Sequence, residues 1–591
     1  MPARRLAALA APWILALGLT RGVVALPERC PPATAEQARA AAVEAVGWFE
    51  RNQRDDGHWI YRYDRDADAV DRQDHVVRQA GITLSLYQAH AAGIPGALEP
   101  ADEGVEWLLG ELVRHDDWAA VERGGLAPSG GTALLVAALS TRRIATDDAR
   151  FDDELDELGR FLVAITEPSG AVVANWDVEA ERPVPGGYSP FFTGETYYAL
   201  ALLATADPGG DWAPTAERIG RYLPGRDDAE DRFPPITDHW GAYGLAQMAL
   251  DAGRPLGPDE RAWGERLAGL FSVEVRFESQ RTGEGWTGLV RGPQIVGAGL
   301  GTIGEGLGSL WRLAASGDDH DLAGERDAVG ERLRCVAGML VDRQVTAAEA
   351  AESGRPGLAR GAWFYKGLTQ MDDQQHSLSA LLLADPALAA EGAAAGGALS
   401  SDDGVSGWRA LWLALVALAA VNPPRVRRLV GRVPAATAVA GSIAAGGVIA
   451  LVAAAGGPLL RALDVSPATG LIGAGLVVAL LGVVDAVRRP GGSFPAAGPG
   501  NGLLVPLLAP ALLRPSVAVL ALAVAADAGW AAGAGVAVAV AAAGVVALLP
   551  SPAGGDRSTM GAARAEAARW GVAAFAIVGG IDLAVHGVLG V

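Results

Sequence analysis

Lysine is nearly absent from this chain of 591 residues: Lys366 is the only one, and the other cationic residues are arginines. Acidic residues outnumber basic ones by 68 to 48, which gives a formal net charge of −20. Proteins that bind nucleic acid rely on clustered Lys and Arg side chains to neutralise phosphates. The composition therefore excludes nucleic acid as a partner.

Motifs that bind metals and cofactors are also missing. The sequence has no HExxH pattern, no Cys-rich ligand set, no GxSxG and no glycine-rich phosphate loop. The histidines His58, His75, His90 and His115 are scattered and lack the spacing of metal ligands. We therefore expect no metal and no cofactor.

Long alternating runs of Val, Ile and Thr are missing too, so strand signals are scarce and the fold is expected to be all-α. Apolar segments with small residues near their starts recur instead. They begin at Arg78, Gly130, Thr193, His239, Gly301 and His376. More polar, amphipathic segments lie before or between them, at 37–52, 103–112, 152–166, 216–223, 258–271 and 323–343.

Six apolar helices alternating with six amphipathic ones indicate an (α/α)6 toroid over residues 34–390. The apolar helices would form the inner ring, because Gly and Ala at their starts allow them to crowd around a central axis. A curved α-solenoid of helical repeats is the structural alternative.

The densest polar cluster is MDDQQH at residues 371–376, followed by apolar residues at helical spacing. Asp372 has the side chain of an N-cap, and capping alone would explain it. Asp373, Gln374 and His376 exceed what capping requires. The cluster therefore predicts chemistry at the start of a helix.

Charge divides the chain into two parts. Beyond residue 400, 12 arginines oppose 8 carboxylates, which leaves a formal charge of −24 for residues 1 to 400. The first part has the composition of a soluble acidic domain. The second is mostly Ala, Val, Leu and Gly, with a linker of small residues over 391–406.

The N-terminal segment 1–25 reads as a secretory signal peptide or an uncleaved signal anchor. Arg4 and Arg5 precede an apolar run over 6–19, and small residues follow up to Ala25. The acidic domain is therefore expected to be exported. Export places Cys30 and Cys335, the only cysteines, where a disulfide can form. Two buried free thiols are the alternative.

Residues 407–590 contain six apolar runs, several of them long enough to span a bilayer. With the acidic domain outside, nine arginines fall in the cytoplasmic loops and two outside, which follows the positive-inside rule. We expect a six-span domain in the cell membrane, multi-pass, with the large N-terminal domain extracytoplasmic.

Several motifs resemble those of bacterial six-hairpin toroid proteins related to glycosidases and glucuronyl epimerases. They are QRDDGHWIYRYD from Gln53, VRQAG from Val77, GGTAL from Gly130, YSPFFTGETYYALALL from Tyr188, TIGEGL from Thr302 and QMDDQQHSLSALL from Gln370. The QxxDGxW string at Gln53 is also similar to the repeat of terpene cyclase toroids. The resemblance covers about residues 34–386 and implies a toroid, without fixing a reaction.

The C-terminal part resembles the MarC and LysE-type families of six-span membrane proteins. VNPPR at Val421 and PLLAPALLRPS at Pro506 interrupt two of the apolar runs, and Pro-broken segments in two halves indicate a transport site. The functional candidates there are Asn422, Arg514, Asp582 and His586.

In such toroids the loops before the inner helices line the central cavity. Aromatic rings beside carboxylates suit a sugar, because rings stack on pyranose faces and carboxylates transfer protons. The catalytic candidates are Glu195, Asp373, His239 and His376. The candidates for substrate binding are Trp59, Tyr63, His75, Arg78, Tyr197, Trp240, Tyr243, Glu305, Trp363 and Tyr365. Alternatively, these groups hold the inner helices together through buried hydrogen bonds, the preferred reading for Arg78, Gln79, Asp372 and Gln374.

The sequence thus predicts a membrane-anchored toroid outside the cell that acts on or binds a cell-envelope glycan, coupled to a transporter-like membrane domain. A glycoside hydrolase, lyase or epimerase would fit. One alternative is a non-catalytic toroid that recognises a small-molecule ligand for a MarC/LysE-like exporter. A second is a terpene-cyclase-like isoprenoid enzyme. Oligomeric state stays open.

Overall fold

The computed structural model describes residues 26–71, 75–226, 237–283, 285–316 and 322–394, and further along 416, 420, 435–455, 474–481, 515–528, 536–541 and 576. The chain separates into two compact units. One is Arg29–Gly397, and the other is Met1–Glu28 together with Ala398–Val591.

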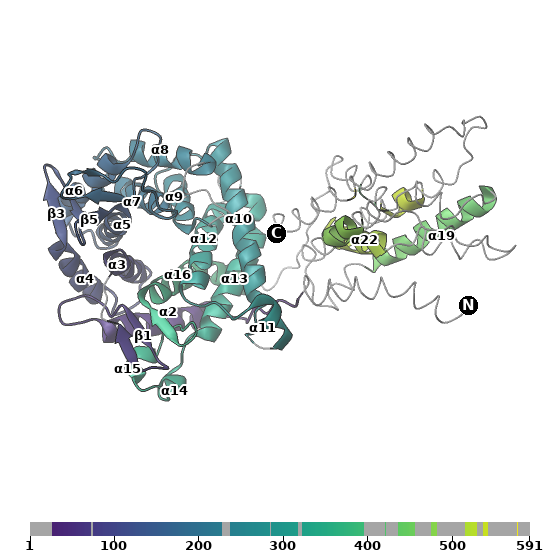
Figure 1. Ribbon diagram of the computed structural model, residues 1–591, viewed down its shortest axis with the longest axis horizontal. Helices are drawn as coiled ribbons and strands as arrows, with labels where there is room; N and C mark the ends of the chain where they lie inside the picture. The colour runs from purple at the N-terminus through teal and green to yellow at the C-terminus, as the bar shows by residue number, and fades with distance from the viewer. Residues whose placement is uncertain are drawn as a thin grey trace. The chain divides into compact units, whose positions relative to one another are not determined.

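Within Arg29–Gly397, inner and outer helices alternate along the chain (Figure 1). The inner helices are α3 (Val76–Ala91), α5 (Ser129–Thr146), α7 (Phe192–Ala206), α9 (His239–Leu250), α12 (Ala298–Ala315) and α16 (Met371–Ala394). The outer helices are α2 (Ala35–Asn52), α4 (Leu98–Gly110), α6 (Asp152–Ile165), α8 (Ala213–Tyr222), α10 (Pro258–Ser279) and α13 (Arg326–Arg343). Successive inner helices pack side by side, and α16 packs against α3. Because the ring closes, the unit is an (α/α)6 toroid and not an open solenoid.

Burial explains which helices lie inside. Every residue of α7 from Thr193 to Leu203 is buried, as expected of a helix with neighbours on all sides. The outer helix α6 instead buries Leu155, Leu158 and Leu162 at helical spacing and turns its acidic face outward. Predicted and observed helices agree in order and type, although α16 extends to Ala394, into the predicted linker.

Short strands occur in addition to the predicted helices, and the sequence did not indicate them because they span only two to four residues. The central one is β1 (Arg62–Asp64), which pairs antiparallel with β2 (Ala69–Asp71) and β8 (Leu368–Gln370). Tyr63 is opposite both Val70 and Thr369. This sheet ties the loop after α2 to the residues just before α16.

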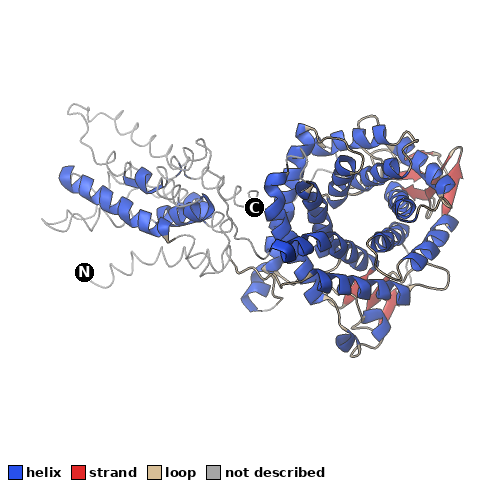
Figure 2. Ribbon diagram, turned by 180° about the vertical axis from the view of Figure 1, so that it is seen from behind, coloured by secondary structure: helices blue, strands red, loops and turns tan. Residues whose placement is uncertain are grey.

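The remaining short elements connect the helices, and the strands among them, red in Figure 2, lie at the edge of the ring. They are β3 (Leu112–His115), β4 (Trp118–Val121), β5 (Leu126–Pro128), β6 (Asn175–Asp177), β7 (Arg182–Pro183), η2 (Leu223–Gly225), α11 (Gly285–Arg291), η3 (Ala323–Glu325), α14 (Ala347–Ala350) and α15 (Pro356–Ala359). β3 pairs with β4, and β6 lies between β5 and β7.

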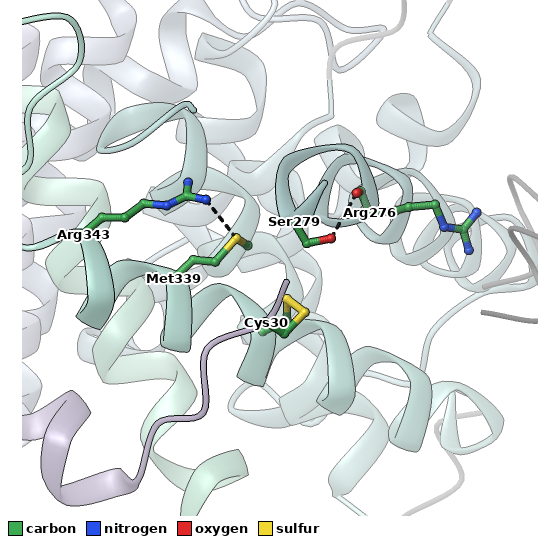
Figure 3. The surroundings of a disulfide bond; sticks show 6 residues. Cys30, Arg276, Ser279, Met339 and Arg343 are labelled. Atoms are coloured by element: carbon green, nitrogen blue, oxygen red, sulfur yellow. Dashed lines mark hydrogen bonds between the residues drawn. A yellow bond between two sulfur atoms is a disulfide. The ribbon is translucent and has the colours of Figure 1, made fainter. Parts of the chain in front are cut away.

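A disulfide joins Cys30, just before α2, to Cys335 on α13, which is the pairing that the sequence predicts (Figure 3). The segment is also held by the Arg29 N–H, which donates to the Ser279 carbonyl over 2.8 Å. The two cysteines are 305 positions apart in the sequence. The disulfide therefore connects the first outer helix to the last one.

In the second unit the structure describes α19 (Ala435–Ala454), α22 (Pro515–Ala528) and shorter helical pieces, which share an apolar cluster that includes Ile449 and Val524. Among the described residues, no helix combines the length and the apolar character needed to cross a membrane. The segment 1–25 and the candidates Asn422, Arg514, Asp582 and His586 lie outside the described residues.

Candidate functional site

The N-terminal halves of three inner helices bring together two histidines and a glutamate. His239 begins α9, whereas Glu305 and His376 lie in the second turns of α12 and α16. His376 Nδ1 is 2.6 Å from Glu305 Oε2, and His239 Nε2 is 3.8 Å from the same oxygen. The two imidazole rings meet edge-on with centroids 5.2 Å apart. The packing of α12 against both α9 and α16 brings these side chains together.

Local structure positions both histidines. Asp238 caps α9, and its Oδ1 accepts a hydrogen bond from the Gly241 N–H over 2.8 Å, which fixes the helix start at His239. Gly301 of α12 lies against the backbone of His376, where a Cβ at position 301 would be 2.4 Å from the His376 carbonyl carbon. Only glycine permits this approach.

Three aromatic rings border the histidines. Tyr198 stacks on Tyr243 with centroids 4.6 Å apart, and Trp240 stacks on Tyr243 at 5.5 Å. The Trp240 ring is also 5.9 Å from His376. The acid–base groups therefore lie beside flat apolar faces of the kind on which a sugar ring packs.

Burial affects the protonation of His239 and leaves one of its ring nitrogens without a hydrogen bond among the described residues. Burial, reinforced by nearby His376, holds its pKa well below the ordinary value of 6.5. Its Nε2 atom is buried and makes no hydrogen bond within the part of the chain that the structure describes. Buried polar atoms are rarely left unpaired, so this nitrogen is available to a bound molecule.

Glu195, in the first turn of α7, is a buried carboxylic acid that also has an unpaired atom among the described residues. Burial raises the pKa of its carboxyl to about 8, against an opposing effect of His376. It is only 5% exposed, and among the described residues its Oε2 atom has no hydrogen-bond partner. At pH 7 it therefore holds a proton that it can donate.

His376 is engaged at both ring nitrogens. Burial opposes its charged form, but the Glu305 carboxylate outweighs burial and raises the pKa of His376. Its Nε2 lies 3.2 Å from Gln375 Nε2, while Gln375 Oε1 makes no bond in the described structure. Turning the amide so that its oxygen faces His376 would satisfy both groups if the imidazole is protonated. His376 and Glu305 thus form a buried, hydrogen-bonded pair next to His239, and burial raises the pKa of the Glu305 carboxyl as well.

Asp373, one of the predicted catalytic residues, is held in place by two backbone hydrogen bonds. Its Oδ1 accepts from the Ala298 N–H and its Oδ2 from the Gln370 N–H, both over 3.0 Å. Burial nevertheless raises the pKa of its carboxyl to about 7. Asp373 therefore joins the start of α16 to the start of α12. The neighbouring Asp372 forms an ion pair with Arg78 over 2.7 Å. This contact between α16 and α3 agrees with the prediction that both residues hold inner helices together.

Four of the residues predicted to bind substrate pack within the toroid. Trp59 and Trp363 are fully buried and donate to the carbonyls of Phe49 and Leu340. Tyr63, also buried, donates to Asp68 over 3.0 Å. Tyr197 lies against glycines of α8 and α9, so it faces away from His239.

The other predicted contacts lie around the starts of α3 and α16. His75 occupies the N-cap position of α3. Arg78 also hydrogen-bonds the Tyr61 hydroxyl. Tyr365 lies in the turn before β8, with the Lys366 ammonium 5.0 Å from its ring centroid.

Tyr198 and Gln375 border the site and were not predicted. Helical spacing contains the signal for Tyr198, because a residue three positions after Glu195 lies on the same helix face, whereas Tyr197 is rotated away from it. Gln375 belongs to the polar cluster at 371–376, but the sequence did not distinguish it from its neighbours as a contact of His376.

His239, Glu305 and His376 are also the residues that could hold a cation, because one ligand atom of each lies within 4.8 Å of the others. Two imidazoles and a carboxylate suit a transition metal. Entry of a metal would break the 2.6 Å contact between His376 and Glu305.

No protein-family model and no curated protein matches the chain. Solved structures do. A cellobiose 2-epimerase from Spirochaeta thermophila is 14% identical, with 60% of this chain and 98% of that one covered and a TM-score of 0.42. An alpha-1,6-mannanase from Salegentibacter sp. is 12% identical, with 60% and 99% covered and a TM-score of 0.31. A type II terpene cyclase from Scytonema is 15% identical, with 60% and 98% covered and a TM-score of 0.35. Function therefore has to be inferred from the side chains.

Proposed function

We propose that the toroid is an enzyme that transfers protons on a sugar-like substrate, with His239 as general base and Glu195 as general acid. The unpartnered Nε2 of buried His239 carries this proposal. A buried nitrogen without a partner, beside a fixed ion pair and an aromatic wall, is explained by a substrate group that takes the missing place.

The two proposed groups have the protonation states that the roles need. A pKa lowered by burial keeps His239 neutral, and one raised by burial keeps Glu195 protonated, at the same pH. Both groups interact electrostatically with His376. The His376–Glu305 pair would orient the substrate and stabilise charge that develops on it.

Epimerisation or isomerisation fits the site better than hydrolysis. A glycosidase needs two available carboxyl groups on either side of the scissile bond. Here Asp372 is bound by Arg78, Asp373 by two backbone N–H groups and Glu305 by His376. When Glu195 is compared with these three carboxyl groups, it alone has a buried oxygen that makes no hydrogen bond among the described residues. One acid and one histidine base are sufficient to move a proton on and off carbon.

The substrate class is a neutral or weakly charged glycan, or a sugar released from one. Tyr198, Trp240 and Tyr243 offer stacked faces, and the polar groups beside them can bind hydroxyls. Because residues 1–25 read as an export signal, the natural source would be the cell envelope.

We also propose that residues 407–590 hold the enzyme at the cell membrane and move or sense its ligand. The motivation is the arginine asymmetry and the two Pro-broken apolar runs in the sequence. Protease added to intact cells should digest the toroid, and full protection would contradict this topology. Complete rescue of an envelope phenotype by the toroid on one unrelated anchor helix would contradict the coupling.

Incubation of the full-length protein with envelope oligosaccharides and their component sugars in D₂O tests the reaction. Epimerisation would place deuterium at the reacting carbon without shortening the chain. His239→Asn should reduce turnover by about 10² to 10⁴-fold, the usual contribution of a positioned base. His115→Asn, a histidine beside Trp118 on the outer side, is the matched control. If the protein binds a sugar but converts none, the result would contradict the proposed reaction and support a non-catalytic toroid that recognises a ligand.

A further inference from the structure

A cavity, here called the rear cavity, lies toward the C-terminal ends of the inner helices. Its volume is about 550 Å³. Whereas Glu195 and His239 lie in first turns, the rear cavity is lined by Gln88, Thr141, Thr205 and Gln247 near the C-terminal ends of α3, α5, α7 and α9. It therefore excludes Glu195, His239, Glu305 and His376, although it shares Tyr198 and Tyr243 with the candidate site.

The lining of the rear cavity combines apolar side chains with several polar ones, and the charges of its Asp and Arg residues balance. Its two such groups, Arg312 and Asp251, face each other over 3.4 Å. The amides and hydroxyls of Gln88, Gln247 and Thr205 supply hydrogen bonds, and Ile144, 48% exposed, supplies apolar contact. The converging C-terminal ends of helices favour groups that donate hydrogen bonds and disfavour anions.

A thin wall separates the rear cavity from the histidines. Tyr198, Tyr243 and Ser379 line the cavity. The Tyr243 hydroxyl also donates to Glu305 Oε1 over 3.4 Å, on the other side from His376. Ser379 donates to Gln88 Oε1 over 2.7 Å. A molecule that binds the Tyr243 hydroxyl from the rear cavity would thus alter the hydrogen bond between this hydroxyl and Glu305.

We propose that the rear cavity is a second binding site for a neutral polyhydroxylated ligand, a sugar of one or two rings, linked to the candidate site through Tyr243. The volume is within the usual range of about 300 to 1,000 Å³ for small-molecule sites. The linkage rests on the proposed function, because it matters only if Glu305 supports catalysis. Binding itself does not rest on it.

A fluorine label at the rim tests binding directly. The only two natural cysteines are bonded to each other, so a single introduced cysteine is labelled selectively. Ala92→Cys places a trifluoroethyl label at an exposed lining position of the full-length protein. Cellobiose or glucose should shift its ¹⁹F resonance with a dissociation constant of about 1 mM or below. Glucuronate should bind at least about tenfold more weakly, because desolvating its charge is costly.

Two further substitutions locate the ligand. Ala145→Trp fills the rim and should raise the dissociation constant at least about tenfold, whereas Ala206→Trp, at the end of α7 outside the lining, should leave it within about twofold. Glu195→Gln should not change the shift, even if the proposed reaction is never found. Absence of any shift at about 50 mM sugar, or a shift that survives Ala145→Trp or disappears in Glu195→Gln, would overturn the proposal.

The linkage through Tyr243 has its own measurement. The ring resonances of His376, followed by histidine-selective NMR at one fixed pH, should shift when cellobiose is added, because Tyr243 contacts Glu305 and Glu305 contacts His376. In Tyr243→Phe, which lacks the hydroxyl on Glu305, this shift should disappear while the ¹⁹F shift persists. Unchanged His376 resonances in the parent protein would contradict the linkage.

Discussion

Replacing Glu195 with Gln should make the toroid more stable at alkaline pH. The carboxyl is buried, its pKa is raised from an ordinary 4.5 to about 8, and its Oε2 lacks a partner. The folded state therefore binds this proton more tightly than the unfolded state. Its contribution to stability is full below pH 4.5 and is lost as the pH rises through the interval to about 8. Glutamine has the same shape and never carries the charge.

The magnitude follows from the pKa difference. At 1.36 kcal/mol per pKa unit, the interval from 4.5 to about 8 corresponds to about 3 to 5 kcal/mol, with an allowance of a unit in the pKa. We expect Glu195→Gln and the parent protein to differ little at pH 4.5. At pH 8.5 the variant should be more stable by about that amount, although it loses activity.

Urea unfolding of the full-length protein in detergent, followed by tryptophan fluorescence at pH 4.5, 7 and 8.5, measures the effect. Glu331→Gln, an exposed glutamate within α13, is the matched control and should not alter the pH dependence. An equal pH dependence in Glu195→Gln and the parent would show that Glu195 is not buried as a neutral acid. The reasoning that makes it the general acid would then fail.

Other expected outcomes concern the reaction, the packing and the disulfide. Turnover should decline above about pH 8 as Glu195 ionises, and should persist below pH 6.5 because the pKa of His239 is lowered, which a pH–rate profile checks. Gly301→Ala should destabilise the fold by about 1 to 3 kcal/mol and displace His376, whereas Gly299→Ala, whose Cβ would meet the flexible Ile295 side chain at 3.1 Å, should be tolerated in thermal unfolding. Cys30→Ser should cost about 2 to 4 kcal/mol, and a reducing agent should lower the stability of the parent but not of the variant. Mass mapping that finds two free thiols in the purified protein would contradict the last expectation.

Helical periodicity in the sequence determined the alternation of inner and outer helices. Apolar segments such as the one from Thr193 are apolar on all sides, and amphipathic ones such as 152–166 are apolar on one side. These patterns depend only on residues close together in the sequence, so they can be recognised without knowing the tertiary structure. The same patterns put Glu195, His239 and His376 near helix starts, which indicated a site there. The pairing of Cys30 with Cys335 was one of two alternatives that the sequence left open, the other being two buried free thiols.

Only the tertiary structure decided which polar side chains form the site. His239 and His376 are 137 positions apart in the sequence numbering, and their 5.2 Å contact depends on how α9, α12 and α16 close the ring. The rotation of each helix about its axis selects Tyr198 over Tyr197, and the approach of two helix starts commits Asp373 to backbone N–H groups. Hydrogen bonds and desolvation depend on such long-range packing, and no local pattern records them.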